Sequence, residues 1–325
     1  MGRAAIGGLL LAWLFMAQAP AMADEAAGAR EAVDQAWWTG PLLAPSANTL
    51  PQGHVLFEPY VYDVIADGRF DASGGRRSAP KAQTVGSQSY LNYGLLDGFT
   101  VGLIPRFGYA EPGVGPHSSG LQAGDLTLQA QYQLTRYRPG GLMPALSVNL
   151  QETLPTGRWD RLARASDGFG AGDFQTAAAL YAQTYVWAPD GRIVRVRLDL
   201  TYSVSGSAAV EGMSVYGTSA GFRGRADPGD AATADLAFEY SATRNWVLAL
   251  DLWFERDADT RVEGRYPGEA PFRADSGASR EVYLAPAVEY NFSPTVGLIA
   301  GARLEPAGRN TGATVTPVAA LNLVF

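Results

Sequence analysis

Apolar and polar residues alternate along most of the chain, and the alternation is most regular from Arg192 to Ser205. Every second position there is apolar or aromatic, at Val194, Val196, Leu198, Leu200, Tyr202 and Val204. The positions between them are polar, at Arg195, Arg197, Asp199, Thr201 and Ser203. A period of two residues predicts a β-strand with one apolar and one polar face. A single strand of this kind fits a soluble sandwich or a membrane barrel, so the recurrence of the pattern decides between them.

The alternation recurs from Gly53 to the last residue and predicts about twelve strands. We place these strands at roughly 54–65, 84–96, 98–110, 123–135, 144–154, 173–187, 192–205, 232–243, 245–256, 280–292, 295–304 and 313–325. Each is long enough to cross a bilayer when tilted, which takes about 9–11 residues. Strands of a soluble sandwich are usually shorter, about 5–6 residues. An even number suits a bacterial barrel with both termini on the periplasmic side.

The predicted connections alternate between short and long. Tight turns are expected at 96–98, 138–141, 188–191, 243–245 and 293–294. Long polar loops are expected at about 66–83, 111–122, 155–172, 206–231, 257–279 and 305–312. Outer-membrane barrels have short periplasmic turns and longer extracellular loops. We therefore expect an all-β fold, a transmembrane antiparallel up-and-down β-barrel at residues 53–325 with a short helical or irregular segment before it.

The N-terminus has the layout of a secretory signal peptide. A basic residue, Arg3, precedes an apolar stretch at 6–16 and an Ala-Met-Ala site at 21–23, which predicts cleavage after Ala23. The apolar stretch is short for the alternative, a membrane anchor. Residues 24–52 follow, and the sequence fits either a periplasmic lead-in or a plug that folds back into the barrel lumen.

Composition excludes several classes of protein. Beyond the N-terminus no apolar run is long enough for a transmembrane helix. The chain has no cysteine, which removes disulfides and thiol chemistry. Its formal net charge of -7 argues against nucleic acid as a partner. We expect no cofactor and no metal.

The candidate functional residues are polar side chains on the lumen side of the predicted strands. They are Arg106, Gln129, Gln131, Arg195, Arg197, Asp199, Asp235, Glu239, Asp251, Glu255, Glu281, Glu289 and Arg303. Two interpretations stand: a mutually paired interior that keeps charge away from lipid, or a lining that selects permeating solutes. Barrels of about eight strands are filled by side chains and those of 16–18 hold a water channel, so a narrow or partly plugged pore is expected here.

Four prolines, Pro59, Pro105, Pro286 and Pro317, fall inside predicted strands, where we expect bulges or strand ends. The glycine-rich stretch 167–173 does not join a strand to a helix, so a flexible outer loop is expected rather than a phosphate site.

Catalytic candidates are few. The chain has two histidines, His54 and His117, and neither lies in a hydrolase or metal motif. A barrel-borne lipid hydrolase that uses one of them is nevertheless kept as an alternative function, and a closed structural barrel as another.

The last predicted strand alternates up to a terminal aromatic residue, Phe325. This ending resembles the C-terminal signal that outer-membrane barrels present to the barrel assembly machinery. Outer-membrane lipid, that machinery and a small-molecule solute are the expected partners, and the oligomeric state stays open.

Three blocks of the sequence stand out: 37–45 (WWTGPLLAP), 50–54 with 58–60 (LPQGH and EPY), and 151–160 (QETLPTGRWD). Together they resemble the meta-pathway phenol degradation family of transporter-like outer-membrane barrels. The resemblance covers most of the mature chain and brings no catalytic residues with it. It implies an outer-membrane channel for passive uptake of small solutes, among them hydrophobic or aromatic compounds.

Overall fold

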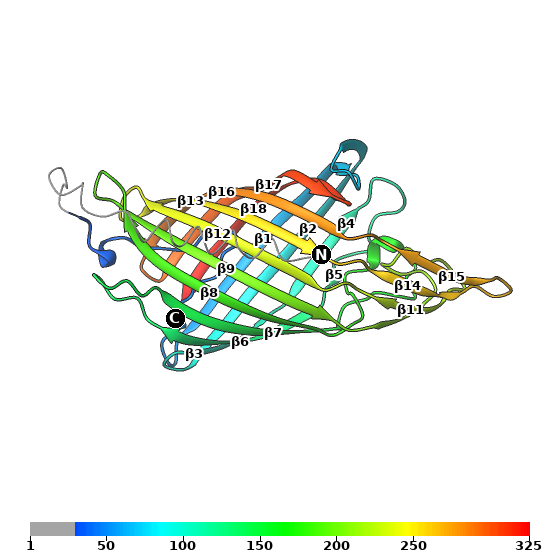
Figure 1. Cartoon of the computed structure of the whole chain (residues 1–325), viewed down its shortest axis with the longest axis horizontal. Coiled ribbons are helices and arrows are strands. Elements are labelled where there is room, and N and C mark those ends of the chain that lie inside the picture. Colours follow the sequence, from blue (N-terminus) through cyan, green and yellow to red (C-terminus); the bar gives the residue numbers. More distant parts are fainter. Residues whose placement is uncertain (1–29) are drawn as a thin grey trace, which may run out of the picture.

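The computed structural model describes residues 30–325, which form a closed β-barrel with a small second sheet at one end (Figure 1). The expected signal peptide and its cleavage site lie outside the described residues. The barrel strands are β1 (Val55–Phe70), β2 (Arg76–Leu96), β3 (Phe99–Ile104) with its continuation β4 (Arg106–Glu111), β6 (Leu126–Thr135), β7 (Ala145–Leu154), β8 (Gln175–Trp187), β9 (Ile193–Ser205), β12 (Ala231–Ser241), β13 (Trp246–Asp257), β16 (Ser279–Ser293), β17 (Val296–Arg309) and β18 (Thr311–Val324). Strand β1 pairs with both β2 and β18, so the sheet closes on itself. The predicted antiparallel barrel of twelve strands is confirmed.

The two faces of the strands separate as the alternation predicts. In β9, Arg197 and Asp199 are each 4% exposed, whereas Tyr202 is 53% and Val204 49% exposed. Because neighbouring strands keep this parity, the polar side chains line the interior and the apolar ones form an outer belt suited to lipid.

Aromatic side chains gather on the outer face near the short-turn end of the barrel. The ring centroid of Tyr290 lies 4.7 Å from that of Trp246 and 4.8 Å from that of Phe292. Trp246 and Phe292 are about half exposed. Outer-membrane barrels carry such girdles where the apolar belt meets the interface.

The predictions of long loops at 66–83 and 305–312 are wrong, because strands occupy most of both stretches. Strand β1 continues to Phe70 and β2 begins at Arg76, so only residues 71–75 connect them. Strand β17 likewise continues to Arg309, one residue before the turn at Asn310. These strand ends extend beyond the apolar belt. Their outward positions are therefore polar, and the alternation disappears although the ladder of hydrogen bonds continues.

The loops at 206–231 and 257–279 are not irregular, because together they form a second sheet. Its strands are β10 (Ala208–Glu211), β11 (Arg223–Asp227), β14 (Arg261–Arg265) and β15 (Pro271–Asp275), paired in that order. The buried side chains of Val210, Phe222 and Val262 form its core. The sheet projects beyond the barrel at the long-loop end (Figure 1).

The glycine-rich loop, expected to be flexible, is held by hydrogen bonds. Asp125, which follows the short strand β5 (Gln122–Ala123), accepts the backbone N–H of Gly157 at 2.8 Å and of Ala171 at 2.7 Å. The loop contains a 3₁₀ turn, η2 (Ala165–Asp167). The backbone N–H of Ser119 donates to Asp167 at 2.7 Å, which lowers the pKa of that carboxyl.

The prolines behave differently from one another. Pro105 separates β3 from β4, as expected of a strand end. Pro59, Pro286 and Pro317 lie within continuous strands and coincide with no register shift, so the expectation of bulges or ends is wrong for these three.

Across residues 30–325, no helix has the length and apolar character that crossing a membrane requires.

Candidate functional site

The N-terminal segment (residues 30–52) passes through the interior of the barrel. It enters at the short-turn end, where the backbone N–H of Glu31 donates to the carbonyl of Gly191 at 3.0 Å. It leaves at the same end, where the N–H of Gln52 donates to Asp97 at 3.3 Å. Between these points most of residues 36–47 are buried. The segment is therefore a loop inserted into the lumen, with one short 3₁₀ turn, η1 (Val33–Gln35).

The tip of the inserted loop is held by one carboxylate. Asp251 of β13 is fully buried, and its two oxygens accept the backbone N–H groups of Leu42, Leu43 and Ala44 at 3.1, 3.3 and 3.1 Å. Consecutive backbone amides around one anion form a nest. Hydrogen bonds to a charged group contribute about 1.5–3 kcal/mol each, so Asp251 is the strongest polar anchor of the tip.

Further polar groups of the wall hold the segment on either side of the tip. The backbone N–H of Thr39 donates to Glu289 at 2.7 Å, and its hydroxyl donates to Asn291 at 2.9 Å. Arg197 donates to the carbonyl of Ala44 at 2.7 Å. Gly297 faces Thr39 so closely that a Cβ there would overlap its hydroxyl.

The paired tryptophans of the WWTGPLLAP block also contact the wall. The guanidinium of Arg244 lies 4.5 Å from the ring centroid of Trp37, and that of Arg195 lies 4.6 Å from that of Trp38. Such cation–π contacts contribute about 0.5–2 kcal/mol each, depending on desolvation.

The tip also has an apolar contact. Leu42 packs in a buried cluster with Ile299, Ala287 and Ala320 of the barrel wall. An apolar residue on the lumen side of a strand, such as Ile299, is thus explained by the inserted loop.

The return half of the segment is hydrogen-bonded to the opposite wall. Gln131 donates to the carbonyl of Ser46 at 2.9 Å, and the N–H of Leu50 donates to Thr100 at 2.9 Å. The segment therefore spans the lumen from β16 and β13 to β6 and β3.

Below the tip, the buried charges form an ion-paired cluster. Glu239 of β12 pairs with Arg195 and, at 3.1 Å, with Arg197, and all three side chains are less than a tenth exposed. Breaking a buried pair leaves an uncompensated charge, which costs about 3–5 kcal/mol.

Two buried aspartates beside this cluster lack hydrogen-bond partners. Asp199 and Asp235 lie directly opposite each other in the β9–β12 ladder and are 4% and 1% exposed. Among residues 30–325, no donor satisfies either oxygen of either carboxylate.

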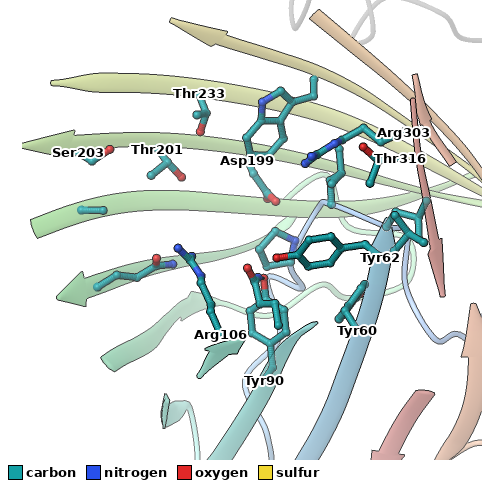
Figure 2. A pocket seen from close by; sticks show the side chains of 18 of the residues that line it. Tyr60, Tyr62, Tyr90, Arg106, Asp199, Thr201, Ser203, Thr233, Arg303 and Thr316 are labelled. Atoms are coloured by element: carbon teal, nitrogen blue, oxygen red, sulfur yellow. The ribbon is translucent and has the colours of Figure 1, made fainter. Parts of the chain in front are cut away.

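Outside the tip lies a cavity of about 640 Å³, the outer cavity. The tip of the segment contributes Leu42, Leu43 and Pro45 to its lining. The lining also has five aromatic side chains, Tyr60, Tyr62, Tyr90, Tyr181 and Trp253. Its charged residues are Arg106, Asp199 and Arg303, three of the predicted lumen residues (Figure 2). The volume falls within the range of small-molecule pockets, about 300–1,000 Å³.

A second cavity of about 470 Å³, the inner cavity, lies at the short-turn end. It is lined by the return half of the segment, residues 48–51, together with Tyr137, Tyr185 and the turn at Asp97. The inserted loop thus contributes to both cavities and lies between them.

The predicted lumen residues have three distinct surroundings. Those that contact the N-terminal segment are Gln131, Arg195, Arg197, Asp251 and Glu289. Those that line the outer cavity are Arg106, Asp199 and Arg303. The others lie against the wall itself: Gln129 donates to Asn92, Glu239 pairs with the arginines, Glu255 accepts from Trp253, Glu281 accepts from Thr311, and Asp235 lies opposite Asp199.

Sequence reasoning missed the aromatic lining and two carboxylates. Tyr60, Tyr62 and Glu58 share the lumen parity of β1, so the alternation contained a signal for them. Glu305, which accepts the hydroxyl of Thr314 at 2.8 Å, was hidden because its strand was expected to end one residue earlier.

The histidines do not form a hydrolase site. Nδ1 of His54 faces the carbonyl of Gln52 at 3.4 Å, and that of His117 lies 4.0 Å from Glu111 on the surface. Neither arrangement supplies a serine–histidine hydrogen bond. Over the described part of the chain, no group of three or more His, Cys, Asp or Glu side chains could hold a metal ion.

Among solved structures, the COG4313 outer membrane channel from Pseudomonas putida F1 aligns with a TM-score of 0.65 and 17% identity, over 86% of this chain and 98% of that one. The β domain of the Bordetella autotransporter BrkA aligns at 0.46 with 13% identity, over 84% and 100%. The Ralstonia pickettii toluene transporter TbuX aligns at 0.39 with 11% identity, over 92% and 96%. At 17% identity, the likeness to the Pseudomonas putida channel is a likeness of fold.

A comparison with curated proteins gives no match. The profile of one protein family does match, over residues 62–316, which is most of the chain. The chain therefore belongs to the family described as "Putative MetA-pathway of phenol degradation", a family of outer-membrane β-barrels.

Proposed function

We propose that this protein is a passive outer-membrane channel for small solutes, and that the N-terminal segment is its plug. A solute enters the outer cavity from the long-loop end and reaches the inner cavity only after the inserted loop moves. The lumen-lining arginines, carboxylates and amides then serve two purposes, since some hold the plug and others face the solute.

The observation that carries this proposal is the position of the inserted loop between two cavities. The loop is held there mainly by polar contacts. Asp251 supplies three hydrogen bonds to the tip, and Arg197 and Glu289 supply one each. Hydrogen bonds of this kind exchange readily with water when a lumen is hydrated, because water competes for both partners. Such a plug can therefore be displaced without unfolding the barrel.

The family description concerns the degradation of phenol, which supports an aromatic solute. A hydrolase is the weaker candidate, because among residues 30–325 the ring of neither His54 nor His117 is hydrogen-bonded to a serine hydroxyl.

The test is single-channel recording of the purified full-length protein in a planar bilayer. Asp251→Ala removes the anchor of three amides, so we expect open steps to become several-fold more frequent than in the unmodified protein. Glu255→Gln is the matched control, because this lumen carboxylate contacts Trp253 at 3.1 Å and does not contact the plug. The proposal fails if no variant conducts, or if both variants behave like the unmodified protein.

A further inference from the structure

One wall of the outer cavity places a cation and an aromatic ring in the same row. Tyr60 of β1 is the register partner of Gln88 of β2, and Gln88 is the register partner of Arg106 of β4. All three line the cavity. Neighbouring strands lie about 4.8 Å apart. The backbones of Tyr60 and Arg106 are therefore two strand spacings apart.

Two more tyrosines extend this wall. The ring centroid of Tyr90 lies 5.8 Å from that of Tyr60 at an interplanar angle of 74°, and its hydroxyl accepts from Gln88 at 2.7 Å. The ring of Tyr62 lies directly over Gly86, where a Cβ would overlap it. Figure 2 shows Tyr60, Tyr62, Tyr90 and Arg106 on this side of the cavity. The glycine thus lets one ring lie flat against the wall, which makes a surface suited to another aromatic ring.

The guanidinium of Arg106 is free to bind an anion. Within residues 30–325 no carboxylate oxygen lies within 4 Å of it, and its side chain donates no hydrogen bond. It is also exposed to the cavity. Arg195 and Arg197 differ in this respect, because both are buried and paired with Glu239.

The other two charged residues of the outer cavity modify this site without replacing it. Arg303 is half-buried, and its guanidinium lies 4.8 Å from the ring centroid of Tyr283. Like Arg106, it has no carboxylate oxygen within 4 Å among residues 30–325. Asp199 is 4% exposed, so a ligand has little direct contact with its side chain. Arg106 is therefore the most exposed of the three charged residues that line the outer cavity.

We propose that the outer cavity binds aromatic carboxylates, with the carboxylate on Arg106 and the ring against Tyr60, Tyr62 and Tyr90. A guanidinium presents paired donors that match a carboxylate, and such charge-assisted bonds are stronger than neutral ones. This inference rests on the proposed channel function and specifies one charge class of its solute.

The test is calorimetric titration of the full-length protein in detergent with benzoate, benzyl alcohol, benzylamine and acetate. We expect benzoate to bind most tightly, since acetate lacks the ring, the alcohol lacks the charge and the amine has the opposite charge. Arg106→Gln should weaken benzoate by about tenfold, which corresponds to about 1.4 kcal/mol, and should change benzyl alcohol by less than about twofold.

Arg265→Gln is the matched control, because Arg265 is an exposed arginine of the second sheet outside the cavity lining. It should leave all four affinities unchanged. Unfolding in urea checks that both variants remain folded.

Two results would overturn the inference: benzylamine or acetate binding as tightly as benzoate, or an unchanged benzoate affinity in Arg106→Gln. Planar-bilayer recording of the same preparations keeps the two proposals apart. Protein that conducts but does not prefer benzoate contradicts the binding site alone. Protein that binds benzoate but never conducts, with or without Asp251→Ala, contradicts the channel alone.

Discussion

The inner and outer halves of the barrel lumen differ in how their polar residues are used. In the inner half, Arg195, Arg197 and Glu239 form a buried ion-paired cluster, and Asp251 and Glu289 accept hydrogen bonds from the inserted loop. In the outer half, Arg106 faces a cavity of about 640 Å³ and pairs with no described carboxylate within 4 Å. Both sets come from the same alternating strands. The inserted loop covers Arg195 and Arg197 of the inner set, whereas Arg106 of the outer set faces the cavity.

This contrast explains why the two interpretations of the lumen charges can hold together. A mutually paired interior describes the inner half, where removal of charge from water requires partners. A lining available to solutes describes the outer half, where the cavity leaves an arginine and several tyrosine rings uncovered. The parity of a strand says which residues face inward, but it does not say which of them another segment covers.

The largest expected effect concerns the ion-paired cluster of the inner half. Glu239→Gln leaves Arg195 and Arg197 buried without their shared carboxylate, so the free energy of unfolding should fall by about 3–5 kcal/mol. Urea unfolding in lipid vesicles measures this change.

The control for that experiment is Glu211→Gln in the second sheet. Glu211 accepts from Arg161 at 2.6 Å, but its side chain is 38% exposed. An exposed pair contributes about 1 kcal/mol or less. Equal losses in the two variants would contradict the contrast between the buried cluster and the surface.

A smaller effect is expected at the aromatic wall of the outer half. Gly86→Ala places a methyl group against the ring of Tyr62, and the ring can turn away because it is the end of a side chain. We expect benzoate to bind a few-fold more weakly, with the free energy of unfolding changed by less than about 1 kcal/mol. Calorimetric titration and urea unfolding measure the two quantities. A large loss of stability with normal binding would mean that Gly86 serves the fold and not the site.

The alternation of residues predicted the strands and their faces, and the alternation of short and long connections predicted their up-and-down order. The alternation of residues also predicted the strand number, and Arg197 and Glu289, which occupy its polar positions, are buried. It failed at the strand ends near Phe70 and Arg309, since the outward positions there leave the lipid belt and lose their apolar character. It also could not foresee the second sheet, whose strands of four or five residues alternate over too short a length.

The position of the N-terminal segment depends on contacts between residues far apart in the chain. Leu42 and Asp251 are separated by 209 positions, and the hydrogen bond between them leaves no periodic signal. The same holds for the outer cavity, because its boundary is set by the tip of the plug as well as by the strands. The sequence therefore contained no signal for the division of the lumen into two cavities.

The central claim is that the plug must move for solute to pass, and a reversible cross-link tests it most directly. The chain has no cysteine, and an added Cβ at Gly297 would lie 3.1 Å from the Cβ of Thr39, close to the separation of about 3.5–4.5 Å that a disulfide needs. The measurement is benzoate flux into liposomes that contain the Thr39→Cys, Gly297→Cys double variant, before and after reduction. The account predicts that oxidation blocks the flux and that reduction restores it, while each single variant is insensitive to redox conditions. Equal flux through the oxidised and reduced double variant, with the disulfide verified, would contradict it.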